Sequence, residues 1–139
     1  KKPRTCHLRF EDHNLYLQWA YLMKISECIP IVSVSCIETA KSFFVDLLGF
    51  TVDFEVDAVV GLLNGSVLIY CIAENSENNR QPAGSANLNF MMDEVDELYS
   101  RCVAADVEIL VEPDNRTYGQ RDFAVRDQDG NVMVFSCGL

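Results

Sequence analysis

The sequence is poor in basic residues and in histidine, and it contains no long apolar segment. Its 139 residues include 11 Lys and Arg against 21 Asp and Glu, which gives a formal net charge of −10 at pH 7. This sign disfavours nucleic acid and anionic membranes, because both are bound through basic side chains. No apolar run reaches the roughly 18 residues of a membrane-spanning helix. We therefore expect neither partner, and the acidity either attracts a cationic ligand or only keeps a bacterial protein soluble.

The cysteines form no recognisable framework of disulfides. They lie inside apolar strand-like or helix-like runs, and no CxxC pair occurs. A chain of this length folds without such cross-links, so we expect free, buried thiols and a cytoplasmic location. The six positions are Cys6, Cys28, Cys36, Cys71, Cys102 and Cys137.

Two halves of the chain repeat one pattern of elements. Each half reads as a strand, a helix and three further strands. A Ser35–Glu38 capping box is expected to start the first helix, and Asp93 is expected to cap the second. In the first half we expect a helix that ends at Gly49, a turn at Asn64-Gly65, and strands at 28–34, 50–56, 59–63 and 67–72. In the second half we expect a turn at 129–131 and strands at 86–91, 107–111, 122–126 and 132–137. The apolar positions of the second helix are Val95, Leu98, Cys102 and Val103.

This repeat predicts the fold class and the domain organisation. We expect an α+β protein whose paired βαβββ modules form an incomplete barrel, with the helices outside and a concave pocket inside. The modules are 28–75 and 85–138, joined by the linker 76–84, in one domain of residues 28–138. Residues 1–27 form an N-terminal extension, either native and helical, with Leu15, Trp19 and Leu22 on one face, or added to a natural protein that starts at Met23.

Three segments resemble the signatures of a known family. Residues 40–50, AKSFFVDLLGF, resemble its first-module signature AxxFYxxxLGF, and residues 92–98, MDEVDEL, are similar to the second-module signature VDDVDxL. Residues 118–131, YGQRDFAVRDQDGN, are similar to the ending WGxRxFxxxDPDGN. These are marks of the vicinal-oxygen-chelate superfamily of glyoxalase I, extradiol dioxygenases, and fosfomycin and bleomycin resistance proteins. The resemblance covers about residues 28–138 and implies the paired-module fold.

The resemblance also implies where a metal would bind. Metal-using members carry His or Gln on the first strand, usually Glu on the fourth, His or Gln on the fifth and Glu on the last. Here these positions hold Ile29, Tyr70 or a neighbour, Asn87 and Val134, a set poorly suited to a divalent ion. Both histidines, His7 and His13, precede the matched region. We therefore expect no metal, no other cofactor and a place in the metal-free bleomycin-resistance-like branch.

Strand alternation from these four positions predicts the surface of the pocket. Phe90, Phe123, Met133 and Phe135 should face the helices as core. Side chains expected to face the concave surface also include Ser33, Leu68, Ile72, Met91, Gln120, Ala124, Val132 and Ser136. The predicted ligand-binding residues are Ile31, Tyr70, Asn87, Asn89, Tyr118, Asp122 and Val134.

Each polar candidate has a second interpretation. Asp122 either accepts a cationic group or pairs with Arg121 or Arg116. The ring of Tyr70 either stacks on a planar or cationic ligand or only packs. The two asparagines, Asn87 and Asn89, either bind the ligand or face solvent.

These expectations favour a binding protein over an enzyme. The leading hypothesis is a metal-independent protein of bleomycin-resistance type that sequesters a small molecule, with a cationic aromatic compound as one ligand class, and thereby confers antibiotic resistance. The resemblance implies a homodimer whose clefts use both chains. The alternative is a metal-independent lyase or isomerase that uses Asp122 or Tyr118 as acid or base. A third hypothesis is a dimeric protein-interaction module that uses the N-terminal segment.

Overall fold

The computed structural model describes residues 25–139, and most of the predicted N-terminal extension, including His7, His13 and Trp19, lies outside them. The elements run β-α-β-β-β twice, as the repeat predicts. Their bounds are β1 Ile31–Val34, α2 Ile37–Lys41, η1 Ser42–Leu47, β2 Thr51–Val56, β3 Val59–Asn64, β4 Val67–Ala73, β5 Asn87–Met91, α3 Val95–Ala104, β6 Glu108–Asn115, β7 Gln120–Arg126 and β8 Val132–Gly138. None of the helices in this described part has the length and apolarity to span a membrane.

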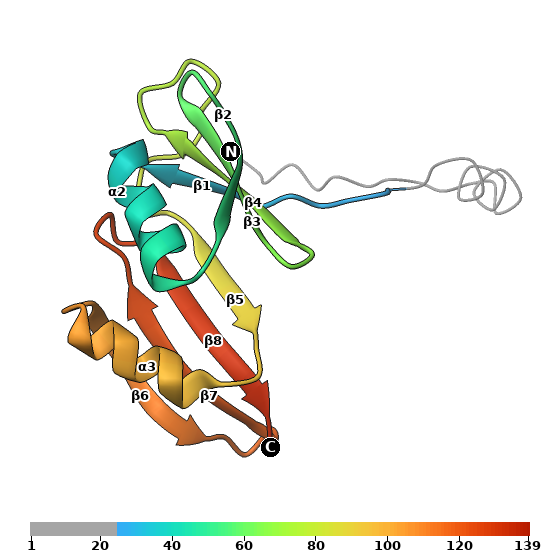
Figure 1. Cartoon of the computed structure of the whole chain (residues 1–139), viewed down its shortest axis with the longest axis vertical. Coiled ribbons are helices and arrows are strands. Elements are labelled where there is room, and N and C mark those ends of the chain that lie inside the picture. Colours follow the sequence, from blue (N-terminus) through green and yellow to red (C-terminus); the bar gives the residue numbers. More distant parts are fainter. Residues whose placement is uncertain (1–24) are drawn as a thin grey trace, which may run out of the picture.

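Each module forms one four-stranded mixed sheet, and the two sheets share one topology. Their strand orders are β1-β4-β3-β2 and β5-β8-β7-β6. In both, the first strand pairs in parallel with the last, and the other pairs are antiparallel. Figure 1 shows the modules one above the other along the long axis, with α2 and α3 on the same side of the molecule. The expected α+β fold of paired modules is confirmed, and the sheets do not close into a barrel.

The helices and the inward faces of both sheets share one hydrophobic core. Phe44, Phe123 and Met133 are fully buried, and Phe50 meets Phe90 edge to face across the two modules with ring centroids 6.1 Å apart. The predicted core positions Phe123, Met133 and Phe135 are therefore confirmed, and Phe90 packs against the same cluster half-buried. By alternation, the opposite face of each sheet carries the candidate site residues.

The helix starts differ from the capping expected from the sequence. The N-cap residues are Cys36 and Glu94, and neither makes a side-chain capping hydrogen bond. Ser35 instead bonds Asp129 through both its backbone N–H, at 3.1 Å, and its hydroxyl, while Glu38 pairs with Lys41 at 2.7 Å. Both capping predictions are thus wrong. At the first helix, a contact between the modules takes the Ser35 hydroxyl that the capping box would use, and at the second the helix begins one residue later than predicted, with Glu94 as N-cap.

The first helix widens into a π-helical turn over its second half. The Leu48 N–H donates to the Phe43 carbonyl at 3.3 Å, five residues earlier. Gly49 then adopts a φ of +73°, which ends the helix as expected from a C-terminal glycine. The sequence periodicity did not distinguish the wider turn from an ordinary α-helix. Val103, expected on the apolar face of α3, is exposed instead.

The turn between β7 and β8 makes hydrogen bonds to the first module and to Ala86, just after the linker. Asn131 is completely buried, and its amide oxygen accepts the Ala86 N–H at 2.9 Å while its amide nitrogen bonds Asp127 at 2.8 Å. Asp129, on the same turn, holds Ser35 of the first module. The predicted 129–131 turn therefore also fixes how the first strand and the linker sit against the second sheet. The other predicted turn is shifted, because Asn64 ends β3 and Gly65, with a φ of +58°, enters the turn.

The cysteines of the described part are free, but they are not uniformly buried. Cys71 and Cys102 are buried, Cys137 is half-buried, and Cys28 and Cys36 are exposed. Burial raises the pKa of Cys71 to about 12 and that of Cys102 to about 11. The expectation of buried thiols therefore holds for two of the five described positions and fails for Cys28 and Cys36.

Candidate functional site

The candidate residues lie on the outer faces of the sheets, which are the faces turned away from the helices. In the first module Ile31 pairs with Tyr70, and Tyr70 pairs with Gly61 on the next strand. Gly61 in turn pairs with Phe54 on β2. These four residues form a row across the module 1 outer face, at which Ile31 remains 62% exposed and Tyr70 half-buried.

An aromatic pair occupies the middle of this row. The rings of Phe54 and Tyr70 meet edge to face, with centroids 5.1 Å apart and planes at 82°, which is a favoured aromatic geometry. The Phe54 ring fits because Gly61 has no side chain. A Cβ built on Gly61 would lie 2.3 Å from Phe54 Cε1 and 2.6 Å from Cδ1.

Part of the expected concave surface of module 1 is covered by the linker. The Ser33 hydroxyl donates to the Gln81 carbonyl at 2.8 Å, and Asn79 donates to the same hydroxyl at 2.6 Å. Ser33 is buried beneath these contacts, and its neighbour Ile72 on β4 is buried as well. Both residues lie on the same face as Ile31 and Tyr70, as strand alternation predicts, and the linker covers Ser33 there through a backbone carbonyl and an amide group.

The module 2 outer face exposes polar side chains beside the apolar Met91. Asn87 and Asn89 are exposed on the edge strand β5, and Asn89 pairs in register with Val134 on β8. The Ser136 hydroxyl donates to Asn89 Oδ1 at 3.2 Å. This bond leaves the amide N–H groups of Asn89 directed to no residue of the described part, so they can donate to a ligand.

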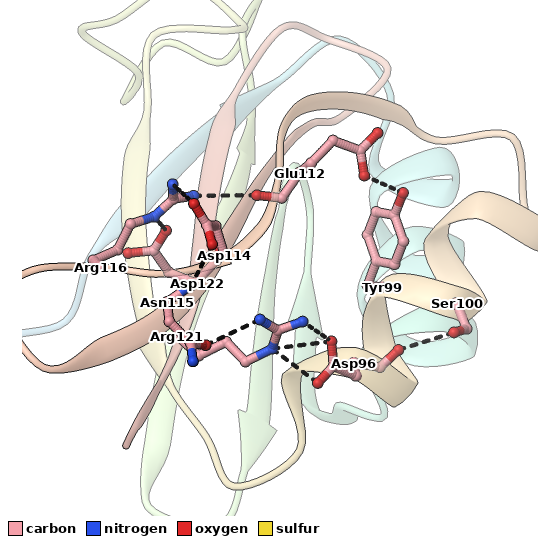
Figure 2. Close-up of polar contacts among 9 residues, drawn as sticks. All are labelled: Asp96, Tyr99, Ser100, Glu112, Asp114, Asn115, Arg116, Arg121 and Asp122. Carbon is pink, nitrogen blue, oxygen red and sulfur yellow. Dashed lines mark hydrogen bonds and ion pairs between the residues drawn. The ribbon is translucent and has the colours of Figure 1, made fainter.

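Asp122 lies on the same face and is already fully engaged. One of its carboxylate oxygens accepts Arg116 Nε at 2.7 Å, and the other accepts the Tyr118 hydroxyl. Arg116 is held in turn by the carbonyls of Glu112, at 3.1 Å, and Asp122 itself, at 3.3 Å. Figure 2 shows the guanidinium of Arg116 between Asp122 and the carbonyl of Glu112. Asp122 is only 7% exposed, whereas the Tyr118 ring is 66% exposed.

The bonds of this cluster displace the pKa values of its members in opposite directions. Burial alone would raise the pKa of Asp122, but the hydrogen bonds from Tyr118 and Arg116 outweigh it and hold the pKa below its usual value. The same bond to Asp122 raises the pKa of the Tyr118 phenol. At neutral pH the carboxyl is therefore ionised and the phenol protonated, and both are stabilised in those states.

Of the two partners considered for Asp122, the structure selects Arg116. Arg121 lies on the other side of β7 and pairs with Asp96 of α3 at 2.7 Å. Figure 2 shows this second pair against the helix, beside the Tyr99–Glu112 contact. Arg121 and Asp122 are consecutive residues of β7, so their side chains lie on opposite faces of the sheet.

The structure brings the candidate residues together in two separate groups. Ile31 and Tyr70 belong to module 1, whereas Asn87, Asn89, Val134, Asp122 and Tyr118 belong to module 2. No hydrogen bond or ring contact joins the two groups within residues 25–139. Cavities of about 660, 330 and 130 Å³ occur in this range, and none is lined by a predicted ligand-binding residue. The 330 Å³ cavity borders the module 1 outer face at Leu63 and Leu68.

Two residues of the faces were missed in the sequence analysis. Phe54 was not among the predicted site residues, and a bulge between Val52 and Phe54 interrupts the alternation by which it could have been placed. Gly61 in the middle of an apolar strand was the available signal, since glycine there marks a close approach of another group. Arg116 was named only as one of two partners, because sequence spacing does not show that the hairpin folds back onto Asp122.

The fold and the position of these groups define a class: paired βαβββ modules with the candidate site on the sheet surfaces rather than on loops. The family model described as Glyoxalase/Bleomycin resistance protein/Dioxygenase superfamily matches residues 24–135. The chain belongs to this superfamily, and the expected family is confirmed. A search of curated protein sequences gives no match.

Solved structures of similar fold include both binding proteins and an enzyme. An antibiotic-binding protein from Streptomyces sp. CB03234 is 25% identical, with a TM-score of 0.69 over 84% of this chain and 99% of that one. The bleomycin-binding protein of Streptomyces verticillus, in complex with copper(II)-bleomycin, is 23% identical, with a TM-score of 0.64 over 84% and 99%. Lactoylglutathione lyase from Agrobacterium tumefaciens is 19% identical, with a TM-score of 0.68 over 84% and 96%.

The residues present do not fit the divalent metal that many members of the family use. Ile29 and Val134 offer no ligand atom, and Asn87 and Tyr70 offer weak ones. Asp122, the carboxylate of the module 2 face described above, is bonded by Arg116 and Tyr118. No group of three or more His, Cys, Asp and Glu side chains that could hold a metal occurs within residues 25–139. We therefore assign no step to a metal.

Proposed function

We propose that this protein binds and sequesters a small molecule on the outer faces of its two sheets, without a metal and without chemical turnover. The observation that carries the proposal is the locked state of Asp122, whose two oxygens accept Arg116 and Tyr118. A general base must accept a proton from the substrate, and a general acid must release one near neutral pH. The low pKa of Asp122 and the raised pKa of Tyr118 oppose both roles.

Sequestration is supported by the kind of protein that shares the fold. The relative that is 25% identical is an antibiotic-binding protein. Such protection needs affinity alone, because a bound molecule is withdrawn from its target by mass action. An antibiotic-like small molecule is therefore the ligand class that we propose, with resistance to it as the biological result. The likeness to the lyase concerns the fold, and no catalytic pair on these faces favours the lyase or isomerase alternative.

We further propose that the functional unit is a homodimer in which each ligand lies between modules of two chains. The two groups of candidate residues occupy different sheets without contact in one chain. Large apolar side chains remain exposed on both outer faces, with Ile31 at 62% and Met91 at 61%. A second copy related by a twofold axis would cover these side chains and bring a polar group opposite an aromatic one. Sedimentation velocity of the full chain should give a dimer, and a monomer at micromolar concentration would refute this part.

The binding function is tested by thermal unfolding of the full chain with a panel of antibiotics and with divalent metals, each with and without EDTA. A ligand at 100 times its Kd should stabilise the folded protein by about 2.7 kcal/mol, with no effect of EDTA. Asn89→Ala should weaken binding of that compound roughly threefold to tenfold, because one hydrogen bond is lost. The matched control Asn78→Ala, in the exposed linker, should not. Stabilisation by a metal that EDTA reverses, or turnover of the compound, would overturn the proposal.

A further inference from the structure

The residues that pair in register on the module 1 outer face are uncharged, and the exposed Asp53 lies in the bulge of β2, outside this register. The strand registers place alternate residues of β1, β2, β3 and β4 on this face. None of them is ionisable at neutral pH, although the chain as a whole carries a net charge of −10. The face consists of Ile31, Ser33, Thr51, Phe54, Val56, Val59, Gly61, Leu63, Leu68, Tyr70 and Ile72.

The open part of this face is aromatic and is held in place. Phe54 occupies the space above Gly61, and its ring meets Tyr70 edge to face at 5.1 Å. Both rings are half-buried, so each still presents surface to solvent. The Tyr70 hydroxyl makes no hydrogen bond with any residue of 25–139 and can pair with a polar substituent of a ligand.

The polar groups of the opposite module are neutral or already neutralised. Asn87 and Asn89 offer uncharged amides, and Asp122 has no oxygen free of a hydrogen bond. A cationic ligand group would have to displace Tyr118 or Arg116 to reach Asp122. The carboxylate of Asp114, which pairs with Asp122 on the same face, is exposed but lies 3.6 Å from the Arg116 guanidinium, which would repel a second cation. The overall negative charge attracts cations at long range, but this attraction is unspecific and is screened by salt.

From these observations we infer that the protein recognises a neutral, planar aromatic ring through Phe54 and Tyr70 of module 1, rather than a cationic group through Asp122. This inference rests on the proposed binding function and narrows its ligand class. It also makes Phe54 a residue that determines specificity, seated there by the absence of a side chain at Gly61.

Three probes that share one ring system test the charge of the ligand. Naphthalene-2-methanol is neutral, 2-naphthylmethylammonium is a cation and 2-naphthoate is an anion. Binding of each to the full chain is measured by calorimetry in 0.5 M NaCl, at which long-range attraction is largely screened. The neutral probe should bind at least about fivefold more tightly than either ion, because an ion would lose hydration without gaining a free partner.

Two variants test the role of Phe54 by different routes. Phe54→Leu keeps an apolar side chain but removes the ring, and Gly61→Ala keeps the ring but displaces it. Both should weaken the neutral probe roughly twofold to tenfold, the range of one aromatic contact. The matched control is Val103→Ala, which truncates an exposed apolar side chain on α3, and it should leave the affinity unchanged. Circular dichroism and the unfolding midpoint of each variant verify that it is folded.

The outcomes separate this inference from the function on which it rests. If the cation binds best, or if Phe54→Leu binds the neutral probe as tightly as the unmodified chain, the inference is wrong while small-molecule binding stands. If no probe of any charge binds, and no compound of the antibiotic panel stabilises the protein, both are refuted. If the neutral probe binds best and both variants bind it more weakly than the unmodified chain, the inference and the binding function are both supported.

Discussion

The two modules share strand order and pairing but differ in the chemistry of their outer faces. The module 1 face is uncharged and centres on Phe54, Gly61 and Tyr70. The module 2 face is polar and centres on Asp122, which is enclosed by Arg116 and Tyr118. The inner faces, by contrast, meet in one continuous apolar core. The two modules therefore share apolar side chains on the faces that pack in the core, whereas the side chains of their outer faces differ.

The difference extends to how each face is covered. In module 1 the linker closes over Ser33 through backbone and amide groups. In module 2 the connection between β6 and β7 folds back, so Arg116 and Tyr118 reach Asp122. The first cover leaves an apolar ring pair accessible, and the second removes a carboxylate from ligand contact. Under the proposed function, the two faces would contact different halves of one amphipathic ligand.

The largest loss of stability should follow from removing Arg116, the cation that pairs with the buried carboxylate of module 2. Arg116→Ala leaves Asp122 buried without its 2.7 Å partner, and breaking such a pair destabilises a protein by about 3 kcal/mol. Arg121→Ala is the matched control, because its partner Asp96 has a side chain that is 62% exposed. That pair should contribute about 1 kcal/mol or less. Urea unfolding at pH 7 measures the free energy of unfolding of both variants. Equal losses would show that the buried Asp122–Arg116 pair stabilises the fold no more than the exposed Asp96–Arg121 pair.

A smaller effect is expected from filling the gap in module 1. Gly61→Ala puts a Cβ where the Phe54 ring lies, and the ring must move, which costs about 1–2 kcal/mol as overpacking. Gly138→Ala is the control, because no atom lies within 4 Å of the new Cβ. Its unfolding free energy should stay the same or rise slightly, since alanine restricts the unfolded chain. Thermal unfolding compares the two, and a neutral Gly61→Ala would mean that Phe54 is not held as described.

The sequence predicted the fold well because the core is periodic. Alternation along β7 and β8 correctly separated Phe123 and Phe135 from Asp122 and Ser136. The family motifs fixed the order of the elements, and the family model agrees with them. These features are local, so they can be recognised in a single sequence.

The candidate site was less predictable because its decisive contacts join distant segments or follow from irregular backbone. Ser33 is covered by Asn79 and Gln81, which lie 46 and 48 residues further along the chain. The bulge between Val52 and Phe54 interrupts the alternation of β2, so Phe54 shares a face with Thr51, three residues earlier. The choice between Arg116 and Arg121 required knowing how the β6–β7 hairpin bends. Single-sequence periodicity contains none of this information.

The smallest predicted effect concerns the pH dependence of the module 2 cluster. The pKa of Asp122 is lower in the folded protein than the ordinary value of 3.8, so the unfolded chain binds a proton more readily. The cluster therefore stabilises the fold above pH 4, and this contribution is lost as the pH falls through the folded pKa. Burial opposes the two hydrogen bonds, so the net contribution is modest.

We expect the free energy of unfolding to fall less steeply between pH 5 and pH 3 in Asp122→Asn than in the unmodified chain. Asp96→Asn serves as a reference, because the pKa of Asp96 is lowered by its bond to Arg121 on the opposite side of the sheet. If the acid dependence of Asp122→Asn matches that of the unmodified chain, the carboxylate is not the stabilised anion of the module 2 face, and the contrast between the faces reduces to packing alone.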